Sequence, residues 1–218
     1  MGAVGLGSPL VLYLAAAGVG TIGIVDDDRV ELSNLQRQVA HTTARLGMAK
    51  VHSAAAAMHA INPATRVEAH ELRLDAGNAA GLIARYDLVA DGSDNFPTRF
   101  LVADSCVAAR RTLVSAAVLR FDGQLSTFKP HADPAGPCYR CLYPAPPPDG
   151  LVPSCSEAGI LGAVTGVMGT LQATEVLKEI LGVGKTLAGR LLTWNALESS
   201  FHTIRVPRDP NCVSCGHG

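Results

Sequence analysis

Short apolar segments alternate with helical segments along the first half of the chain, and this alternation limits the possible folds more than any other feature. Segments 21–25 and 87–90 are mostly apolar and are followed by acidic residues, which is typical of buried parallel strands. Further strands are predicted over 66–72 and 112–118, and helices over 10–17, 48–61, 76–85 and 97–110. The alternation predicts an α/β protein with a doubly wound, Rossmann-like, mostly parallel sheet.

The second half of the chain predicts a different arrangement. A strand-like segment over 124–129 leads into residues 130–158, whose many prolines, cysteines and glycines predict an irregular insert. A long helix over 160–181 is followed by a closing pair of strands over 190–194 and 201–206, which we expect to be antiparallel. We expect the whole chain, residues 1–218, to form a single domain.

Four glycines, at positions 159, 162, 166 and 169, recur along the long helix at three- and four-residue spacing. Each glycine inside a helix costs up to about 1 kcal/mol, so such a row usually reflects close packing. The neighbour is either the sheet of the same chain or a second subunit.

The chain begins with a glycine-rich turn, Gly2-Ala3-Val4-Gly5-Leu6-Gly7, directly before a predicted helix. Such a turn can cradle a nucleotide phosphate, although glycine-rich turns are common in α/β folds without a ligand. In a doubly wound sheet a strand precedes this turn and lies at the centre of the sheet. We therefore expect that the sheet lacks its first strand and that the chain is N-terminally incomplete, which would expose the edges of two apolar strands.

Composition and charge exclude several classes of protein. The net charge is −1 and the basic residues are scattered, so the chain lacks the basic surface of a nucleic-acid-binding protein. The N-terminus does not resemble a secretory signal, and the most apolar segment, 159–184, is interrupted by glutamine, glutamate and lysine. We expect a cytoplasmic protein that binds neither nucleic acid nor membranes.

Four of the six cysteines form two C-x-x-C pairs, Cys138 with Cys141 and Cys212 with Cys215. In a reducing compartment this spacing favours a metal over disulfides or redox pairs. Four thiolates would make a closed, structural Zn²⁺ site if the fold brings the pairs together. Of the remaining two, Cys106 is predicted to lie in the core, whereas Cys155 lies in a proline- and glycine-rich segment where a thiol could be exposed.

Charged residues follow the predicted strands in an order that suits a nucleotide triphosphate. Asp26 ends the strand 21–25, where a carboxylate can accept hydrogen bonds from ribose hydroxyls. Arg37 and Lys50 could neutralise phosphates, and Asp94 with Asn95 follows another strand, where a carboxylate suits Mg²⁺. Taken singly, the same residues could be a solvated acidic turn, two surface cations and a helix cap.

Together these motifs resemble the ThiF/MoeB family of adenylyltransferases for ubiquitin-like sulfur-carrier proteins, which are related to ubiquitin-activating enzymes. The resemblance covers essentially the whole chain. It rests on the segments Val25-Asp26-Asp27-Asp28, Ser33-Asn34-Leu35-Gln36-Arg37-Gln38, Lys50, Ser93-Asp94-Asn95, Cys138-Tyr139-Arg140-Cys141, Cys155-Ser156-Glu157-Ala158-Gly159 and Cys212-Val213-Ser214-Cys215.

The resemblance implies an activity, its cofactors and its partners. ATP and Mg²⁺ would adenylate the C-terminal Gly-Gly carboxylate of a carrier protein and release pyrophosphate, and the enzyme would be a homodimer. The implied nucleotide-site residues are Gly5, Asp26, Ser33, Asn34, Leu35, Gln36, Arg37, Lys50, Asp94 and Asn95. Arg37, Lys50 and Asp94 would support catalysis, with Asp94 on Mg²⁺, and the four paired cysteines would hold structural Zn²⁺.

Two positions qualify what the resemblance implies. Val4 stands where the family's glycine turn has its middle glycine, and its side chain would crowd a phosphate. Cys155 matches a cysteine that forms a thioester or persulfide link with the carrier in some members, so it is a candidate catalytic residue. Because the chain ends soon after Cys215, we expect sulfur to come from a separate sulfurtransferase.

Two other functions remain open at this stage. A relative that has lost activity would bind a carrier protein without activating it. A zinc-containing NAD-dependent oxidoreductase would share the glycine turn and Asp26, but it would leave Arg37, Lys50 and Asp94 without a role.

Overall fold

The computed structural model describes residues 2, 5–148 and 159–216. The helices are α1 (Gly7–Ala16), α2 (Lys50–Ile61), α3 (Ala79–Ile83), α4 (Phe96–Ala108), α5 (Tyr139–Leu142) and α7 (Gly162–Leu181). The strands are β1 (Thr21–Val25), β2 (Arg66–His70), β3 (Leu88–Asp91), β4 (Thr112–Leu119), β5 (Asp122–Phe128), β6 (Arg190–Asn195) and β7 (Ser200–Arg205). Every predicted helix and strand is present at nearly its expected place, and the described part of the insert contains one helical turn, α5.

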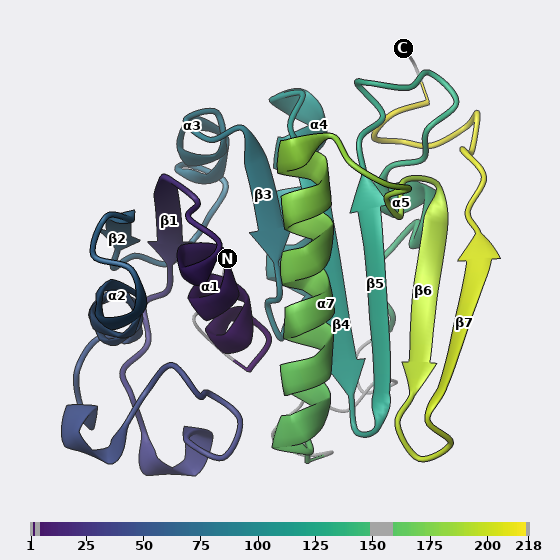
Figure 1. The fold of residues 1–218 in the computed structure, drawn as a ribbon. Helices are drawn as coiled ribbons and strands as arrows, with labels where there is room; N and C mark the ends of the chain where they lie inside the picture. The colour runs from purple at the N-terminus through teal and green to yellow at the C-terminus, as the bar shows by residue number, and fades with distance from the viewer. Residues whose placement is uncertain (1, 3–4, 149–158, 217–218) are drawn as a thin grey trace.

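The strands form two sheets whose pairings change from parallel to antiparallel along the chain. β1 and β2 pair in parallel in one sheet, and the other has the order β3-β4-β5-β6-β7. Within it only β3 and β4 are parallel, because β4 turns directly into β5 and the following strands form a meander (Figure 1). These pairings confirm the α/β, Rossmann-like fold with antiparallel C-terminal strands.

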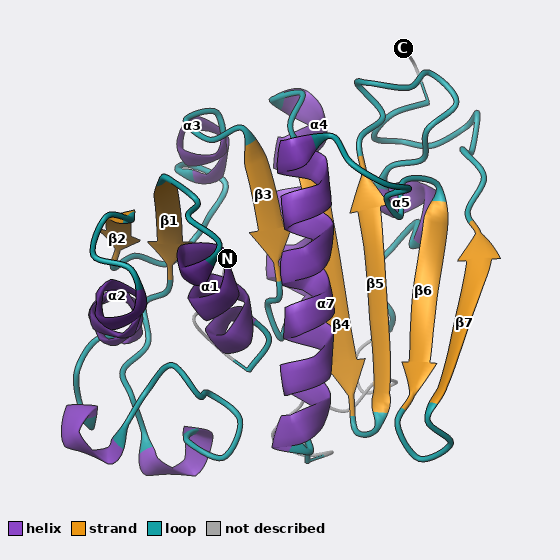
Figure 2. Ribbon diagram, viewed as in Figure 1, coloured by secondary structure: helices purple, strands orange, loops and turns teal. Residues whose placement is uncertain are grey.

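The helices cover the two faces of the five-stranded sheet (Figure 2). Along β4, Val114, Ala116 and Val118 belong to the core beneath α1 and α7. Leu113 belongs instead to a second core, which α4 and α5 cover. This division follows from the alternation of side chains along a strand. Among the described residues, no helix has the length and apolar character needed to cross a membrane.

No strand of the described residues lies between β1 and β3, where the first strand of a doubly wound sheet belongs. A hollow of about 780 Å³ separates these two strands, and apolar side chains of β1, β3, α1 and α7 line most of it. The absence of a central strand is thus confirmed for the described residues.

Close contacts within the chain explain two of the four glycines in the row along α7. A Cβ on Gly169 would lie 2.4 Å from the carbonyl oxygen of Leu6, and one on Gly162 would lie 2.0 Å from that of Gln36. Nothing lies within 4 Å of the corresponding point on Gly166. Close packing of α7 therefore fixes the N-terminal turn of α1 and the loop around Gln36.

These contacts give a matched pair of substitutions. Gly169→Ala should destabilise the fold by about 1–3 kcal/mol, because backbone atoms of Leu6 would have to move. Gly166→Ala should instead be neutral or stabilising by up to about 1 kcal/mol, because alanine favours a helix. Urea unfolding measures both. Equal stability of the two variants would contradict the packing of α7 against α1.

Candidate functional site

Two hollows adjoin where β3 ends. The polar hollow, of about 210 Å³, lies between the N-terminal turn, the loop after β1 and the loop after β3. The aromatic hollow, of about 260 Å³, lies along β4 and β5 beside α5. Asp94, Arg99 and Val118 line both. Because the two hollows share this wall, ligands bound in them would meet near Asp94.

The charged side chains that line the polar hollow come from residues near the ends of strands or at the start of a helix. Asp28 follows β1, Lys50 is the first residue of α2, and Asp94 follows β3. Arg37 comes from the loop between β1 and α2, which returns to the hollow after a short 3₁₀ turn over Leu32–Asn34. The carboxyl ends of parallel strands are where ligands bind in open α/β sheets.

The two predicted phosphate-binding cations are held by neighbouring oxygen atoms. The Lys50 side chain is 4% exposed, and its Nζ lies 2.6 Å from Oδ2 of Asp28. Arg37 donates from one terminal nitrogen to Oδ1 of Asn34 at 2.8 Å and from the other to the carbonyl of Ser33. Both contacts fix the cations at the wall of the hollow while leaving N–H groups for further acceptors.

Two buried polar atoms of residues that line the polar hollow lack a hydrogen-bond partner within the described residues. Within the described residues, the hydroxyl of Ser93 and Oε1 of Gln38 are buried without a hydrogen bond, and both side chains line the polar hollow. An unpaired buried polar atom costs about 1–3 kcal/mol, so a polar ligand here would offset that cost. Together with the cations, these atoms fit a phosphorylated ligand such as ATP.

Five of the predicted nucleotide-site residues line the polar hollow together: Gly5, Asn34, Arg37, Lys50 and Asp94. Asp26 is buried beside them, and its Oδ1 accepts a hydrogen bond from the backbone N–H of Asp28. Its carboxylate also lies within 4.8 Å of those of Asp27 and Asp28. The structure thus gathers the charged core of the predicted site.

The other predicted residues point elsewhere or lie beyond the described chain. Ser33 donates to Glu31, Gln36 donates to the carbonyl of Ile160, and Leu35 does not line the polar hollow. Asn95 accepts from the backbone N–H of Thr98 at 2.9 Å and so caps α4, the structural role that the sequence left open. Val4 and Cys155 lie outside the described residues.

Arg99 is a site residue that sequence reasoning missed. It is 8% exposed, and it donates to the carbonyls of Ala116 and Ser93, which ties β4 to the loop after β3. An arginine among apolar residues on a predicted helix is the signal that could have revealed it, because a buried arginine needs partners. Arg99 lines both hollows.

The aromatic hollow was not predicted either. Phe96, Phe128, Tyr139 and Tyr143 line it, and Tyr139 contacts Tyr143 with ring centroids 5.0 Å apart. Burial raises the pKa of Tyr139 to about 12, so this phenol stays protonated at neutral pH. Burial also raises the pKa of Tyr143, whose hydroxyl donates to Gln124. The hollow therefore offers a mostly apolar surface, with Asp94, Arg99, Asp122 and Gln124 among its polar lining residues.

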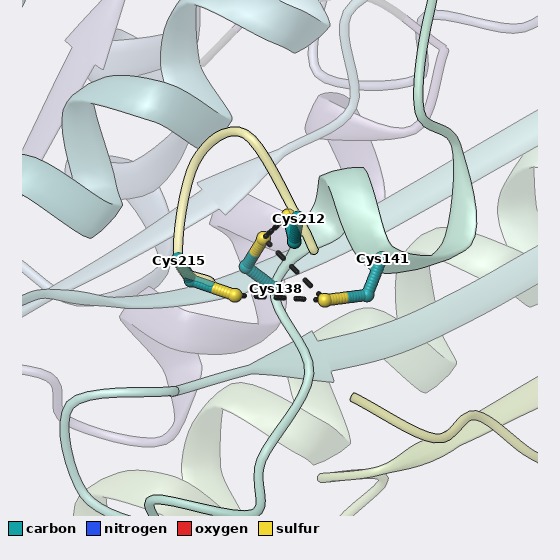
Figure 3. Close-up of side chains that lie close together, drawn as sticks. All are labelled: Cys138, Cys141, Cys212 and Cys215. Atoms are coloured by element: carbon teal, nitrogen blue, oxygen red, sulfur yellow. Dashed lines mark hydrogen bonds between the residues drawn. The ribbon is translucent and has the colours of Figure 1, made fainter. Parts of the chain in front are cut away.

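The two C-x-x-C pairs meet in space, as predicted (Figure 3). The Sγ atoms of Cys138 and Cys141 lie 3.9 Å apart, and those of Cys138 and Cys212, and of Cys141 and Cys215, lie 3.5 Å apart. A disulfide would bring two sulfurs to about 2.05 Å. Sulfurs that each lie about 2.3 Å from one Zn²⁺ in a tetrahedron are about 3.8 Å apart, so the thiols fit a zinc site.

Hydrogen bonds to one carboxylate connect the two halves of the cysteine cluster. Arg140, between the first two cysteines, binds both oxygens of Asp104 at 2.7 and 2.8 Å. Ser214, between the other two, donates to the same carboxylate at 3.1 Å. Asp104 on α4 thus connects both pairs, which orients them toward a common centre.

The family model and the relatives that match this chain agree with one another. The model of the ThiF family matches residues 1–214. The sulfur carrier protein adenylyltransferase of Thermus thermophilus is 52% identical over 99% of this chain and 80% of its own length. The adenylyltransferase and sulfurtransferase MOCS3 of Bos taurus is 54% identical, and the probable adenylyltransferase/sulfurtransferase MoeZ of Mycobacterium tuberculosis is 53% identical. This chain spans 47% and 54% of those two proteins, about half of each.

Solved structures share the fold. The crystal structure of E. coli MccB with ATP superposes with a TM-score of 0.85 at 21% identity, and it covers all of this chain and 66% of MccB. PaaA superposes with a TM-score of 0.79 at 20% identity, over 96% of this chain and 63% of PaaA. At this level of identity the likeness concerns the fold alone.

Proposed function

The chain belongs to the ThiF family, and from this premise we propose that it is an adenylyltransferase that uses MgATP to activate a ubiquitin-like sulfur-carrier protein. The observation that carries the proposal is the meeting of two hollows at Asp94, one polar with Arg37 and Lys50 on its wall, the other apolar. The polar hollow would take the triphosphate, and the aromatic hollow would take the end of the carrier.

The chemistry of this reaction matches the side chains at the site. A C-terminal carboxylate has a pKa of about 3.5, so it is ionised at neutral pH and needs no general base. One of its oxygens attacks the α-phosphorus of ATP, the bond to the bridging α–β oxygen breaks, and pyrophosphate leaves with that oxygen. The reaction therefore needs positioning and charge neutralisation, which cations and a metal-binding carboxylate supply.

Each charged residue has a proposed role in this arrangement. Arg37 and Lys50 bind phosphate oxygens, and Asp26 accepts hydrogen bonds from the ribose. Asp94 holds Mg²⁺, which, when bound, would neutralise charge on the leaving pyrophosphate. Gly5 and Asn34 complete the wall of the polar hollow, whereas contributions from Ser33, Leu35, Gln36 and Asn95 stay predictions.

The carrier's C-terminal Gly-Gly suits the aromatic hollow. Two glycines have no side chains, so an extended tail could pass between Tyr143 and the residues of β4 and β5 to reach Asp94. Arg99, on the border of both hollows, would attract the terminal carboxylate. A larger residue at either of the last two tail positions should block entry.

A second copy of the chain has a surface to bind beside the polar hollow. Leu32, Val39, Leu46 and Met48 are 68, 60, 46 and 42% exposed, although all four are large apolar residues. All four belong to the segment between β1 and α2, and exposed large apolar residues on one segment support the predicted homodimer. The source of the sulfur and any covalent role of Cys155 stay predictions.

Nucleotide binding separates the proposed function from its alternatives. MgATP at one hundred times its dissociation constant should stabilise the protein by about 2.7 kcal/mol, and NAD should not change the melting temperature. A carrier protein ending in Gly-Gly should then support exchange of labelled pyrophosphate into ATP, whereas the same carrier without its last glycine should not. Stabilisation by NAD alone would favour an oxidoreductase. MgATP binding without exchange for any carrier would favour a relative that has lost activity.

A further inference from the structure

A basic hollow of about 730 Å³ lies at the end of the five-stranded sheet opposite to the end of β3, the strand that Asp94 follows. It lies where β6 begins and β7 ends, beneath loops from 129–137 and 206–208. It shares no lining residue with the polar or the aromatic hollow. Its charged lining residues are four cations and one carboxylate: Lys129, Arg190, Arg205, Arg208 and Asp133.

Within the residues that the structure describes, three of these cations have no acidic partner. Lys129 is neutralised, because its Nζ lies 2.8 and 2.9 Å from the carboxylate oxygens of Glu179. By contrast, Arg190 donates to the carbonyls of Lys185 and Thr186. Arg208 likewise donates to carbonyls, those of Pro134 and Cys215. These contacts position the guanidinium groups and leave their charge uncompensated.

Arg205 is the most available of the three. It is exposed, and in the part of the chain that the structure describes its side chain makes no hydrogen bond or ion pair. It lies directly opposite Arg190 in the antiparallel pairing of β6 with β7. Like charges at opposed positions of a sheet destabilise it, so an anion between them would remove that repulsion.

The lining indicates the kind of anion. Ala135, Gly136, Pro137, Ala188 and Gly189 supply small side chains, so a main chain can approach the floor closely. The lining contains no aromatic residue on which a nucleic-acid base could stack. Guanidinium groups bind carboxylates through paired hydrogen bonds. We propose that the basic hollow binds an extended, acidic segment of a partner polypeptide.

Binding of a labelled peptide tests this proposal in the full chain. A fluorescein-labelled peptide of alternating glutamate and glycine should bind at low ionic strength, as measured by fluorescence anisotropy, and added salt should release it. Arg205→Glu should weaken binding roughly tenfold or more, because it reverses a charge in the hollow. Arg205→Lys keeps the charge but loses the paired hydrogen bonds of the guanidinium, so it should weaken binding by less than Arg205→Glu does.

Arg73→Glu is the matched control. Arg73 is also exposed and forms no ion pair with the described residues, but it lies between β2 and α3, on the other side of the molecule from β6 and β7 (Figure 1). This variant should bind the peptide within about twofold of the original chain. Equal binding by Arg205→Glu and Arg73→Glu would overturn the proposal, as would the absence of peptide binding. Tighter binding of an oligothymidylate of equal charge would assign the hollow to nucleic acid instead.

Discussion

Replacing Asp94 by asparagine is expected to lower the turnover number of carrier-dependent pyrophosphate exchange at least about a hundredfold. Asp94 is the exposed carboxylate at which the polar and aromatic hollows meet, and the proposed function places Mg²⁺ there. Asparagine keeps the size of the side chain but removes its charge, so a metal would lose its anionic ligand. Steady-state exchange, measured at saturating and limiting MgATP, separates an effect on turnover from one on nucleotide binding.

The fold should tolerate this change. The Asp94 carboxylate accepts a 3.4 Å hydrogen bond from the Asn95 side chain, which an amide oxygen can accept as well. Asp87→Asn is the matched control, because Asp87 is also exposed but precedes β3, whereas Asp94 follows it. The control should keep its rate within about twofold. If Asp94→Asn exchanged pyrophosphate as fast as Asp87→Asn, Asp94 would have no role in the chemistry.

The fold could be predicted largely because its signals are local. Apolar runs such as 21–25 and 87–90 mark buried strands, and their order along the chain defines an α/β sheet. The antiparallel β4–β5 pairing was harder to foresee, because it depends on a tight turn at Arg120, which adopts a φ of 54°. Nothing in the residue type of Arg120 signals a left-handed conformation.

The charged part of the candidate site could be predicted for a similar reason. Asp94 closely follows β3, Arg37 belongs to the connection from β1 to α2 and Lys50 begins α2, and the sheet gathers the residues after its parallel strands at one edge. Arg99 and the aromatic hollow escaped prediction, because they depend on which face of α4 and α5 turns toward β4 and β5. The side chain of Asn95 caps α4, which is the structural role that the sequence left open, and its contribution to nucleotide binding stays a prediction.

The cysteine cluster could be predicted only in part, because its sequence motif does not show how the two pairs lie in space. The spacing within each pair identified four ligands, but only the fold could bring Cys138 and Cys141 to the C-terminal residues. The bridge through Asp104, which contacts Arg140 and Ser214, could not be predicted, because its three members are far apart in the sequence.

Loss of one cysteine ligand is expected to have the largest effect on stability. Cys212→Ser should release Zn²⁺ and lower the free energy of unfolding by about 5 kcal/mol, since a structural zinc site contributes its binding energy to folding. The four thiols join the loop before α5 to the C-terminal residues, so that tail should become sensitive to proteases first.

Val213→Ser is the control for the zinc site, because Val213 lies between the two C-terminal cysteines and is 77% exposed. Elemental analysis should find one zinc per chain in the original protein and in Val213→Ser, but none in Cys212→Ser. A reducing agent should leave all three proteins unchanged, because sulfurs 3.5 to 3.9 Å apart are not disulfide-bonded. Zinc-free protein whose stability falls on reduction would instead assign the cysteines to disulfides. With zinc bound and reduction without effect, the cluster is a structural metal centre that fastens the C-terminal tail to α4 and α5.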